Sequence, residues 1–290
     1  MTHSDITTST TTTPGTVLVL GGTGKTGRRV VALLRERGVE VRAASRSGDT
    51  PFDWGDPATW GPALSGVSAV YVVGPEGSPS PTPGFVELAV ATGVRRLVLL
   101  SARGTGTPGY LTDAVGAPHR ESEAAVRSSG VVWTILRPGW FAQNFSEGVF
   151  LDGVRAGELS LPTGDGSAAF VDADDIAAVA VAALVEDGHD GEVYELSGPR
   201  ALSVAEMLDE IAKAAGVRAA YVPVTPSAYR AGLEAQGVPA EEAAVWTEAM
   251  DPILTSREAP LTDGVRRALG RPPRDMADFA RDAAAAGAWA

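Results

Sequence analysis

Three glycines spaced three residues apart, Gly21, Gly24 and Gly27, directly follow the apolar run at residues 17–20. A segment with helical spacing of apolar residues opens immediately behind them, so the stretch predicts a strand, a tight turn and a helix. Glycine has no Cβ, and its backbone can turn sharply and come close to a pyrophosphate. Helix N-termini favour anions because their N–H groups and dipole point outward. The stretch therefore indicates a nucleotide-binding α/β unit.

Two phosphate-binding motifs resemble this glycine-rich stretch. Gly24-Lys25-Thr26 matches the end of a P-loop, but that motif requires a glycine five residues before Gly24, where this chain has Val19. The remaining G-x-x-G-x-x-G pattern is a variant of the dinucleotide fingerprint, and a glycine-rich turn without a ligand is the alternative. We expect the nucleotide to contact Gly21, Thr23, Gly24, Lys25, Thr26 and Gly27.

The end of the second expected strand carries no carboxylate. An NAD-specific site of this class places an acidic residue there, about 20 residues beyond the fingerprint, to bind the ribose 2′-hydroxyl. Here residues 43–47 read Ala-Ala-Ser-Arg-Ser. Arg46 and Ser47 can instead bind a 2′-phosphate through charge-assisted hydrogen bonds. This favours NADP(H), and a solvated loop cation is the alternative interpretation of Arg46.

Apolar strand-like runs alternate with helical segments through the first half of the chain. The runs lie at residues 17–20, 39–45, 52–54, 67–73, 96–101 and 131–136. This alternation is typical of an α/β, Rossmann-type doubly wound parallel sheet, whose ligands bind at the carboxyl ends of the strands. We expect those ends to bring Asp53, Gly74, Pro75, Ser101 and Pro138 to the cofactor.

The alternation loosens after the sixth run, which suggests a division of the chain. We expect a threonine-rich disordered tail at 1–14 and an NADP-binding domain at 15–150, its sheet completed by parts of 170–198. Residues 151–290 are expected to form a smaller, mostly helical substrate-binding lobe. Aspartates at 172, 174 and 175 precede an Ala/Val-rich segment and are expected to cap a helix.

The composition restricts the partners. The formal net charge of -12 argues against nucleic acid and anionic membranes, which both favour basic surfaces. The chain has no cysteine and three scattered histidines, so we expect no disulfide and no metal site. We expect no secretion signal and no membrane span, because residues 1–14 contain no long apolar run and the rest has no apolar stretch of membrane-spanning length. We expect a cytoplasmic monomer or homodimer acting on a small molecule.

One loop after the sixth strand is rich in aromatic and amide side chains. Trp140, Phe141, Asn144 and Phe145 fall within six residues. This composition suits a planar, apolar substrate. Packing of the aromatic rings inside the lobe is the alternative.

The chain resembles the NmrA-like group of atypical short-chain dehydrogenases/reductases over nearly its whole ordered length. The matching stretches are residues 21–28, 96–103, 119–123, 133–141, 144–145 and 171–176. The Gly-Gly-Thr-Gly-Lys-Thr-Gly form and residues 140–145 look most like the ergot-alkaloid (agroclavine and festuclavine) reductases and their bacterial relatives. NAD(P)H quinone oxidoreductases and triphenylmethane reductases are related members. The resemblance implies a Rossmann fold and an NAD(P)H-dependent oxidoreductase.

The chain departs from the wider superfamily at the catalytic pair. Other members use Tyr-x-x-x-Lys on the helix after the fifth strand, whereas residues 118–125 contain no such pair and Tyr110 has no lysine four residues on. His119, at the expected start of a helix over 119–128, is the main acid/base candidate, and a solvated or capping histidine is the alternative. Ser101 and Tyr110 are further candidates for orienting the substrate or donating a hydrogen bond.

These observations predict an NADPH-dependent reductase of a planar, apolar electrophile, an iminium, quinone, enone or carbonyl compound, in secondary metabolism. Acceptors that are already electrophilic need less proton donation, which suits the missing pair. Two alternatives remain: a cyclase, isomerase or epimerase that keeps its NADP bound, and a nucleotide-sensing regulator of the NmrA kind.

Overall fold

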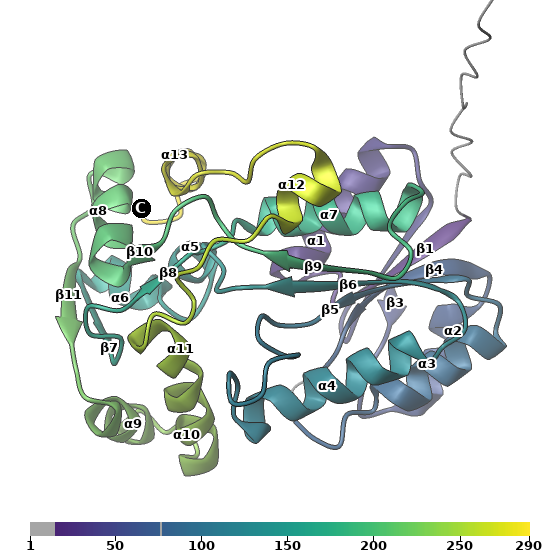
Figure 1. Cartoon of the computed structure of the whole chain (residues 1–290), viewed down its shortest axis with the longest axis horizontal. Coiled ribbons are helices and arrows are strands. Elements are labelled where there is room, and N and C mark those ends of the chain that lie inside the picture. Colours follow the sequence, from purple (N-terminus) through teal and green to yellow (C-terminus); the bar gives the residue numbers. More distant parts are fainter. Residues whose placement is uncertain (1–14, 76) are drawn as a thin grey trace, which may run out of the picture.

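The computed structural model describes residues 15–75 and 77–290, so the expected tail at 1–14 lies outside the described residues. Its centre is a seven-stranded parallel sheet in the order β3-β2-β1-β4-β5-β6-β9 (Figure 1). This order confirms the predicted doubly wound Rossmann-type architecture. The strands are β1 Thr16–Leu20, β2 Val41–Ser45, β3 Thr50–Pro51, β4 Val67–Val73, β5 Arg96–Leu100, β6 Val132–Pro138 and β9 Glu192–Leu196.

Helices cover both faces of the sheet (Figure 1). One face carries α1 Lys25–Glu36, α7 Ala173–Val185 and α12 Gly264–Leu269. The other carries α2 Trp60–Leu64, which follows the 3-10 turn η1 Pro57–Thr59, together with α3 Thr82–Ala91 and α4 Asp113–Arg127. Both α7 and β9 come from the segment 170–198 that was expected to complete the sheet.

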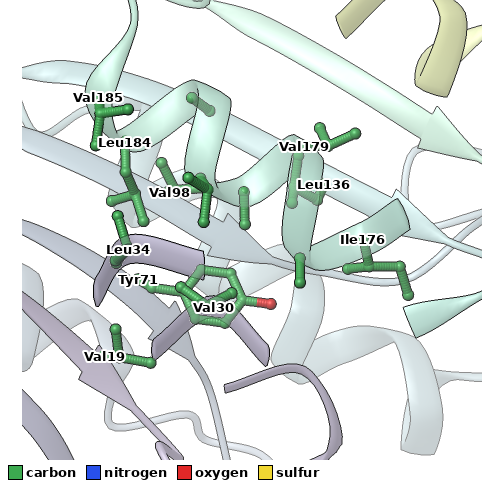
Figure 2. Close-up of a cluster of buried hydrophobic side chains, with 14 of the residues drawn as sticks. Val19, Val30, Leu34, Tyr71, Val98, Leu136, Ile176, Val179, Leu184 and Val185 are labelled. Carbon is green, nitrogen blue, oxygen red and sulfur yellow. The ribbon is translucent and has the colours of Figure 1, made fainter. Parts of the chain in front are cut away.

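Successive side chains of each strand point to opposite faces of the sheet, and together they form two buried layers. Val17 and Val19 of β1 point to the α1/α7 face, and Leu18 and Leu20 point to the opposite face. Figure 2 shows the first layer, in which Val19, Val30, Val98 and Ile176 belong to the same buried cluster as Tyr71. Both faces of the sheet are therefore buried, as is typical of parallel sheets.

The third strand differs from its expected position. The structure has β3 at Thr50–Pro51, whereas Phe52 and Trp54 leave the sheet and pack against Phe85, with ring centroids 5.5 and 5.2 Å away. Asp53 lies between them in a turn, where its side chain accepts the Gly55 N–H at 2.8 Å. The packing of Phe52 and Trp54 on Phe85 therefore outweighs their strand propensity, and it leaves the Asp53 side chain exposed to solvent.

A mostly helical lobe lies at the carboxyl ends of the strands (Figure 1). Its core holds Phe145, Phe150, Phe170, Met207 and Trp289. Two small sheets, β10 with β8 and β11 with β7, connect the helices. The elements are α5 Asn144–Glu147, α6 Leu151–Ala156, β7 Glu158–Leu161, β8 Ser167–Ala168, β10 Leu202–Ser203, α8 Val204–Ala215, β11 Ala220–Pro223, α9 Pro226–Ala235, α10 Ala240–Ala249, α11 Asp251–Leu254 and α13 Met276–Ala285.

Within the described ranges, every helix is too short or too polar to cross a bilayer.

Candidate active site

The glycine-rich turn is held by close backbone contacts that tolerate no side chain. Gly21 has a φ of +62°, and a Cβ on Gly27 would lie 2.1 Å from the Gly21 carbonyl oxygen. A Cβ on Gly22 would lie 2.9 Å from the Cβ of Ala43 on the neighbouring strand. The glycines thus bring the start of α1 tightly against β1 and β2.

The start of α1 presents unpaired amides to the carboxyl edge of the sheet. Gly24 is the extended N-cap residue and provides no side-chain cap. Arg28 donates the first amide bond, to the Gly24 carbonyl at 3.1 Å. Among the described residues, the N–H groups of Lys25, Thr26 and Gly27 have no backbone acceptor. Free N–H groups at a helix N-terminus, here beside Thr23 in the turn, are of the kind that can bind an anion.

The end of β2 holds an unsatisfied hydroxyl next to a cation. Ser45 Oγ is buried and has no hydrogen-bond partner in the described chain. Arg46 and Ser47 follow it and are exposed, and no ion pair to a described residue holds Arg46. Asp49 is the first carboxylate after the strand. A buried donor beside a cation fits a bound phosphate oxygen.

The loop after β4 is fixed by α3 and α4. A Cβ on Gly74 would lie 3.3 Å from Thr82 Oγ1 and 3.5 Å from Ser122 Oγ. Glu121 of α4 accepts the Ser80 N–H at 2.5 Å. Gly74 and Pro75 therefore lie at the carboxyl end of β4. Asp53 instead lies in the exposed turn between Phe52 and Trp54.

Ser101, at the end of β5, belongs to a buried ionic cluster. Its Oγ donates to Glu123 Oε1 at 2.7 Å, and Arg137 donates to both Glu123 oxygens at 2.8 and 2.7 Å. Burial alone would raise the pKa of Glu123, but hydrogen bonds from Arg137 and Ser101 lower it below its usual value. Pro138, which ends β6, accepts the Arg103 N–H at 2.9 Å. The cluster joins the ends of two central strands.

The helix that carries His119 begins earlier than expected. It starts at Asp113, so His119 lies in its second turn and not at its N-terminus. Pro118 resembles a helix start in the sequence, but it is buried inside α4 and its carbonyl accepts from Ser122 Oγ at 2.8 Å. Burial lowers the pKa of His119, opposed by the charge of Glu123. The imidazole is therefore neutral near pH 7.

Tyr110 contacts a segment far away in the sequence. Its hydroxyl lies 2.8 Å from Glu258 Oε1 and 2.9 Å from the Arg257 carbonyl oxygen. Arg103 donates to the carbonyls of Glu258 and Pro260 at 3.1 and 2.6 Å. The stretch 255–262 thus crosses the carboxyl edge of the sheet as a strap.

A cavity of about 220 Å³ opens beside Tyr110. Apolar groups of Leu111, Val115 and Pro252 line it, with Glu248 and Arg257 among its charged residues. It lies between the α10–α11 segment and the stretch formed by the loop after β5 and the start of α4. Its volume suits one ring of a ligand rather than a whole dinucleotide.

The aromatic side chains of the loop at residues 140–145 are buried to different extents. Phe145 is fully buried, 5.1 Å from Phe150 and 5.5 Å from Phe170 between ring centroids. Trp140 is half-buried and stacks on Phe150, and Phe141 packs against the α1/α7 layer. The side chain of Asn144 accepts from Lys25 Nζ at 3.0 Å, which joins this loop to the glycine turn.

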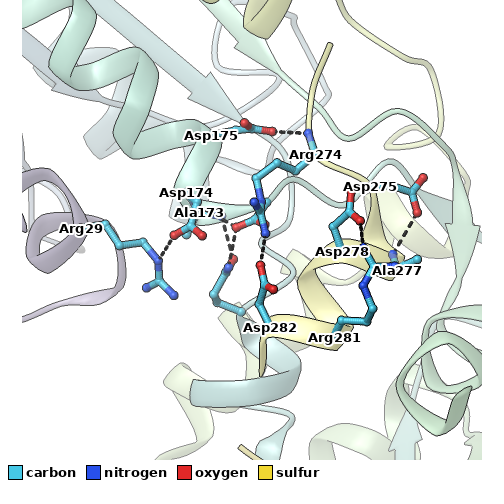
Figure 3. A network of polar contacts seen from close by, with 12 residues as sticks. Arg29, Ala173, Asp174, Asp175, Arg274, Asp275, Ala277, Asp278, Arg281 and Asp282 are labelled. Carbon is cyan, nitrogen blue, oxygen red and sulfur yellow. Dashed lines mark hydrogen bonds and ion pairs between the residues drawn. The ribbon is translucent and has the colours of Figure 1, made fainter. Parts of the chain in front are cut away.

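Ion pairs join the N-terminal end of α1 to that of α7, and α7 to the segment before α13 (Figure 3). Arg29 binds Asp174 at 2.6 Å, and Arg274 binds Asp172 at 2.7 Å. Asp172 also caps α7 by accepting the Asp174 N–H at 2.9 Å, as expected from the sequence. A polar cavity of about 280 Å³ lies among these side chains.

Sequence reasoning missed Glu123, Arg103 and Glu258 as site residues. Glu123 lies four residues after His119 on one helix face, a spacing that offered a local signal. Arg103 and Glu258 are 155 residues apart, and no periodicity connects them. Across residues 15–75 and 77–290, no group of three or more His, Asp or Glu side chains is placed to hold a metal ion.

Residues 21–187 match the family model described as NAD(P)H-binding. The chain is 36% identical over 284 residues to the uncharacterized oxidoreductase YesF of Bacillus subtilis, covering 94% of this chain and 96% of that protein. It is 32% identical over 285 residues to agroclavine dehydrogenase of Claviceps fusiformis, covering 92% and 96%.

Among solved structures, the NADPH-dependent quinone oxidoreductase of Escherichia coli in complex with NADPH has a TM-score of 0.78. The identity is 24%, and the match covers 92% of this chain and 99% of that chain. The chain therefore belongs to the NAD(P)H-binding family and is an NAD(P)H-dependent oxidoreductase.

Proposed function

We propose that this protein uses NADPH to reduce a planar, apolar, electrophilic metabolite: an iminium, quinone, enone or carbonyl compound, in secondary metabolism. The observation that carries the proposal is the pair of anion sites along one sheet edge. The unpaired amides at the start of α1 suit a pyrophosphate, and Ser45 with Arg46 suits a second phosphate one strand away.

The preference for NADPH over NADH rests on the end of β2. Ser45 Oγ is a buried donor that needs an acceptor, and Arg46 is an exposed cation beside it. A 2′-phosphate supplies both the acceptor and the counter-charge, whereas a 2′-hydroxyl supplies no charge. NADPH is also named in the structure of the quinone oxidoreductase relative. When bound, NADPH supplies the hydride, and the protein orients the acceptor and manages the proton.

The acceptor side is proposed around the aromatic loop and the Tyr110 cavity. Trp140 offers a half-buried ring, and Asn144 links the loop to the cofactor turn through Lys25. Phe141 and Phe145 belong to the same loop, where Phe141 packs against the α1/α7 layer and Phe145 lies in the core of the lobe. Agroclavine dehydrogenase and the quinone oxidoreductase are named for ring-shaped compounds, which supports a planar acceptor.

Of the three candidate catalytic residues, we assign the direct role to Tyr110. It lines the cavity, whereas the Ser101 hydroxyl is already committed to Glu123. His119 is a neutral, largely buried imidazole and is assigned a supporting role in the wall of the cleft.

Loss of nicotinamide absorbance with a panel of acceptors tests this function. We expect oxidation of NADPH, faster than of NADH, with at least one iminium, quinone or enone. Failure to bind NADPH would refute the proposal. Conversion of a substrate without any absorbance change would instead favour the non-redox alternative, and equal affinity for both oxidation states without turnover would favour a nucleotide sensor.

A further inference from the structure

We propose that Glu258 is a positioning residue that passes a proton to Tyr110, and that this pair equips the enzyme to reduce neutral acceptors. The inference rests on the proposed function. It assigns a role to a buried carboxyl on the strap, a segment that the cofactor-binding pattern does not include.

The position of the Glu258 carboxyl is the first argument. The residue is 3% exposed, and its Oε2 has no hydrogen-bond partner in the described chain. A Cβ on Gly139 would lie 2.8 Å from this oxygen, so the glycine after β6 leaves the space that it occupies. The orphan oxygen therefore lies against the carboxyl edge of the sheet, next to the residue that precedes Trp140.

The second argument is that the Tyr110 hydroxyl has one hydrogen but two oxygen neighbours. The Tyr110 hydroxyl lies within hydrogen-bond distance of two oxygens, Glu258 Oε1 at 2.8 Å and the Arg257 carbonyl at 2.9 Å. A hydroxyl has one hydrogen, and a carbonyl oxygen has none to offer. Both contacts are satisfied together when Glu258 is protonated and donates to Tyr110, while Tyr110 donates to Arg257.

The surroundings favour the protonated carboxyl. The charged and titratable groups that face it are Tyr110 and Arg103 from the loop after β5, Glu195 from β9 and Arg257 from the strap. Burial raises the pKa of Glu258, and Glu195 acts in the same direction, against Tyr110 and the two arginines. Arg103 Nη1 lies 3.7 Å from Oε2 and can stabilise the carboxylate once the proton has left.

The chemistry explains why two acids are needed. A neutral acceptor that gains a hydride must also gain a proton, and Tyr110 lines the cavity from which it can donate one. Burial raises the pKa of Tyr110, so a free tyrosinate is costly. When an acceptor occupies the cavity, the Tyr110 hydroxyl must turn its hydrogen from the Arg257 carbonyl toward the acceptor. As that O–H bond breaks toward the acceptor, the Glu258 O–H bond breaks toward Tyr110, and solvent later restores the Glu258 proton. A cationic acceptor becomes neutral with the hydride alone and needs no such transfer.

The test compares the two kinds of acceptor in the full-length protein. Tyr110→Phe and Glu258→Gln each remove one transferable proton while keeping the side-chain shape. Tyr229→Phe on α9 and the exposed Glu87→Gln on α3 are the matched controls. We expect kcat with an enone or quinone to fall roughly 100-fold in both test variants, with KM little changed. Reduction of a cationic iminium or triphenylmethane dye should remain at the wild-type rate.

Two measurements do not depend on turnover by the variants. Infrared difference spectra of the wild type at neutral pH should show the C=O stretch of a protonated carboxyl, absent in Glu258→Gln. The wild type should also show a solvent deuterium isotope effect on kcat with the neutral acceptor and none with the cation.

The possible failures are separable. A wild type that binds NADPH but reduces no acceptor overturns the proposed function and the relay with it. An active wild type whose variants lose both activities equally, or neither, overturns the relay alone, as does an ionised Glu258 in the infrared spectrum. A wild type that reduces cations only also excludes it.

Discussion

The proposed cofactor side and the proposed acceptor side of the sheet edge are built in different ways. On the cofactor side, backbone groups within one turn do the work: Gly21, Gly24 and Gly27 contact one another directly. On the acceptor side, side chains join distant segments, as Arg103 does with Glu258 and Ser101 with Glu123. We therefore expect an added side chain to disrupt the glycine turn. We expect the loss of a charged group to disrupt the side-chain contacts of the acceptor side.

The largest effect is expected from adding one methyl group to the glycine turn. Gly27→Ala places a Cβ 2.1 Å from the Gly21 carbonyl oxygen, so the turn must open. We expect a loss of about 3 kcal/mol of stability and a rise in the Kd for NADPH of roughly 100-fold, measured by urea unfolding and cofactor fluorescence. Gly61→Ala in α2, where a Cβ meets nothing within 4 Å, is the control. Similar behaviour of the two variants would show that the turn is not sterically closed.

Removing one charge tests the acceptor side. Glu123→Gln leaves the Arg137 guanidinium without its carboxylate and weakens the bond from Ser101. We expect a loss of about 2 to 3 kcal/mol in the free energy of unfolding, because hydrogen bonds to buried charges are lost. NADPH affinity should change little. A large loss of NADPH affinity with normal stability would contradict the separation of the two sides.

Arg46→Ala examines a place where the proposed cofactor side depends on a charged side chain. We expect a roughly 10- to 100-fold weaker affinity for NADPH and an unchanged affinity for NADH, because a charge-assisted bond contributes about 1.5 to 3 kcal/mol. Titration with both nucleotides measures the ratio. Equal weakening for the two would assign Arg46 to the shared part of the cofactor.

The smallest effect is a pair of opposite pH dependences on the acceptor side. The folded-state pKa of Glu123 is lowered from 4.5, so its stabilisation is present above that value and is lost as pH falls through the lower folded value. The folded-state pKa of Glu258 is raised from 4.5, so its contribution is present below that value and is lost as pH rises through the higher folded value.

Urea unfolding between pH 3 and 8 separates the two groups. Relative to wild type, Glu123→Gln should lose most stability at the neutral end of this range. Glu258→Gln should become relatively more stable as pH rises. Parallel curves for the two variants would contradict the opposite pKa shifts of Glu123 and Glu258.

The same difference explains what the sequence could predict. The glycine turn and the cation at the end of β2 follow from local patterns, since neighbouring residues define each of them, and the doubly wound sheet follows from the alternation of strands and helices. The third strand was misplaced because Phe52 and Trp54 satisfy strand propensity but pack against Phe85, 31 or more residues later in the chain. The start of α4 was missed because Pro118 imitates a helix boundary, and Glu258 because its partners come from a loop that no sequence pattern associates with the strap.

The bond from Trp289 Nε1 to the Phe145 carbonyl, 2.8 Å long, has a consequence for biosynthesis. It spans 144 positions and is buried in the lobe core. During translation, the six strands up to Pro138 can pair long before Trp289 has been made, whereas the lobe must wait for it. The glycine turn at the start of α1 is therefore present in the growing chain long before the core of the lobe can close.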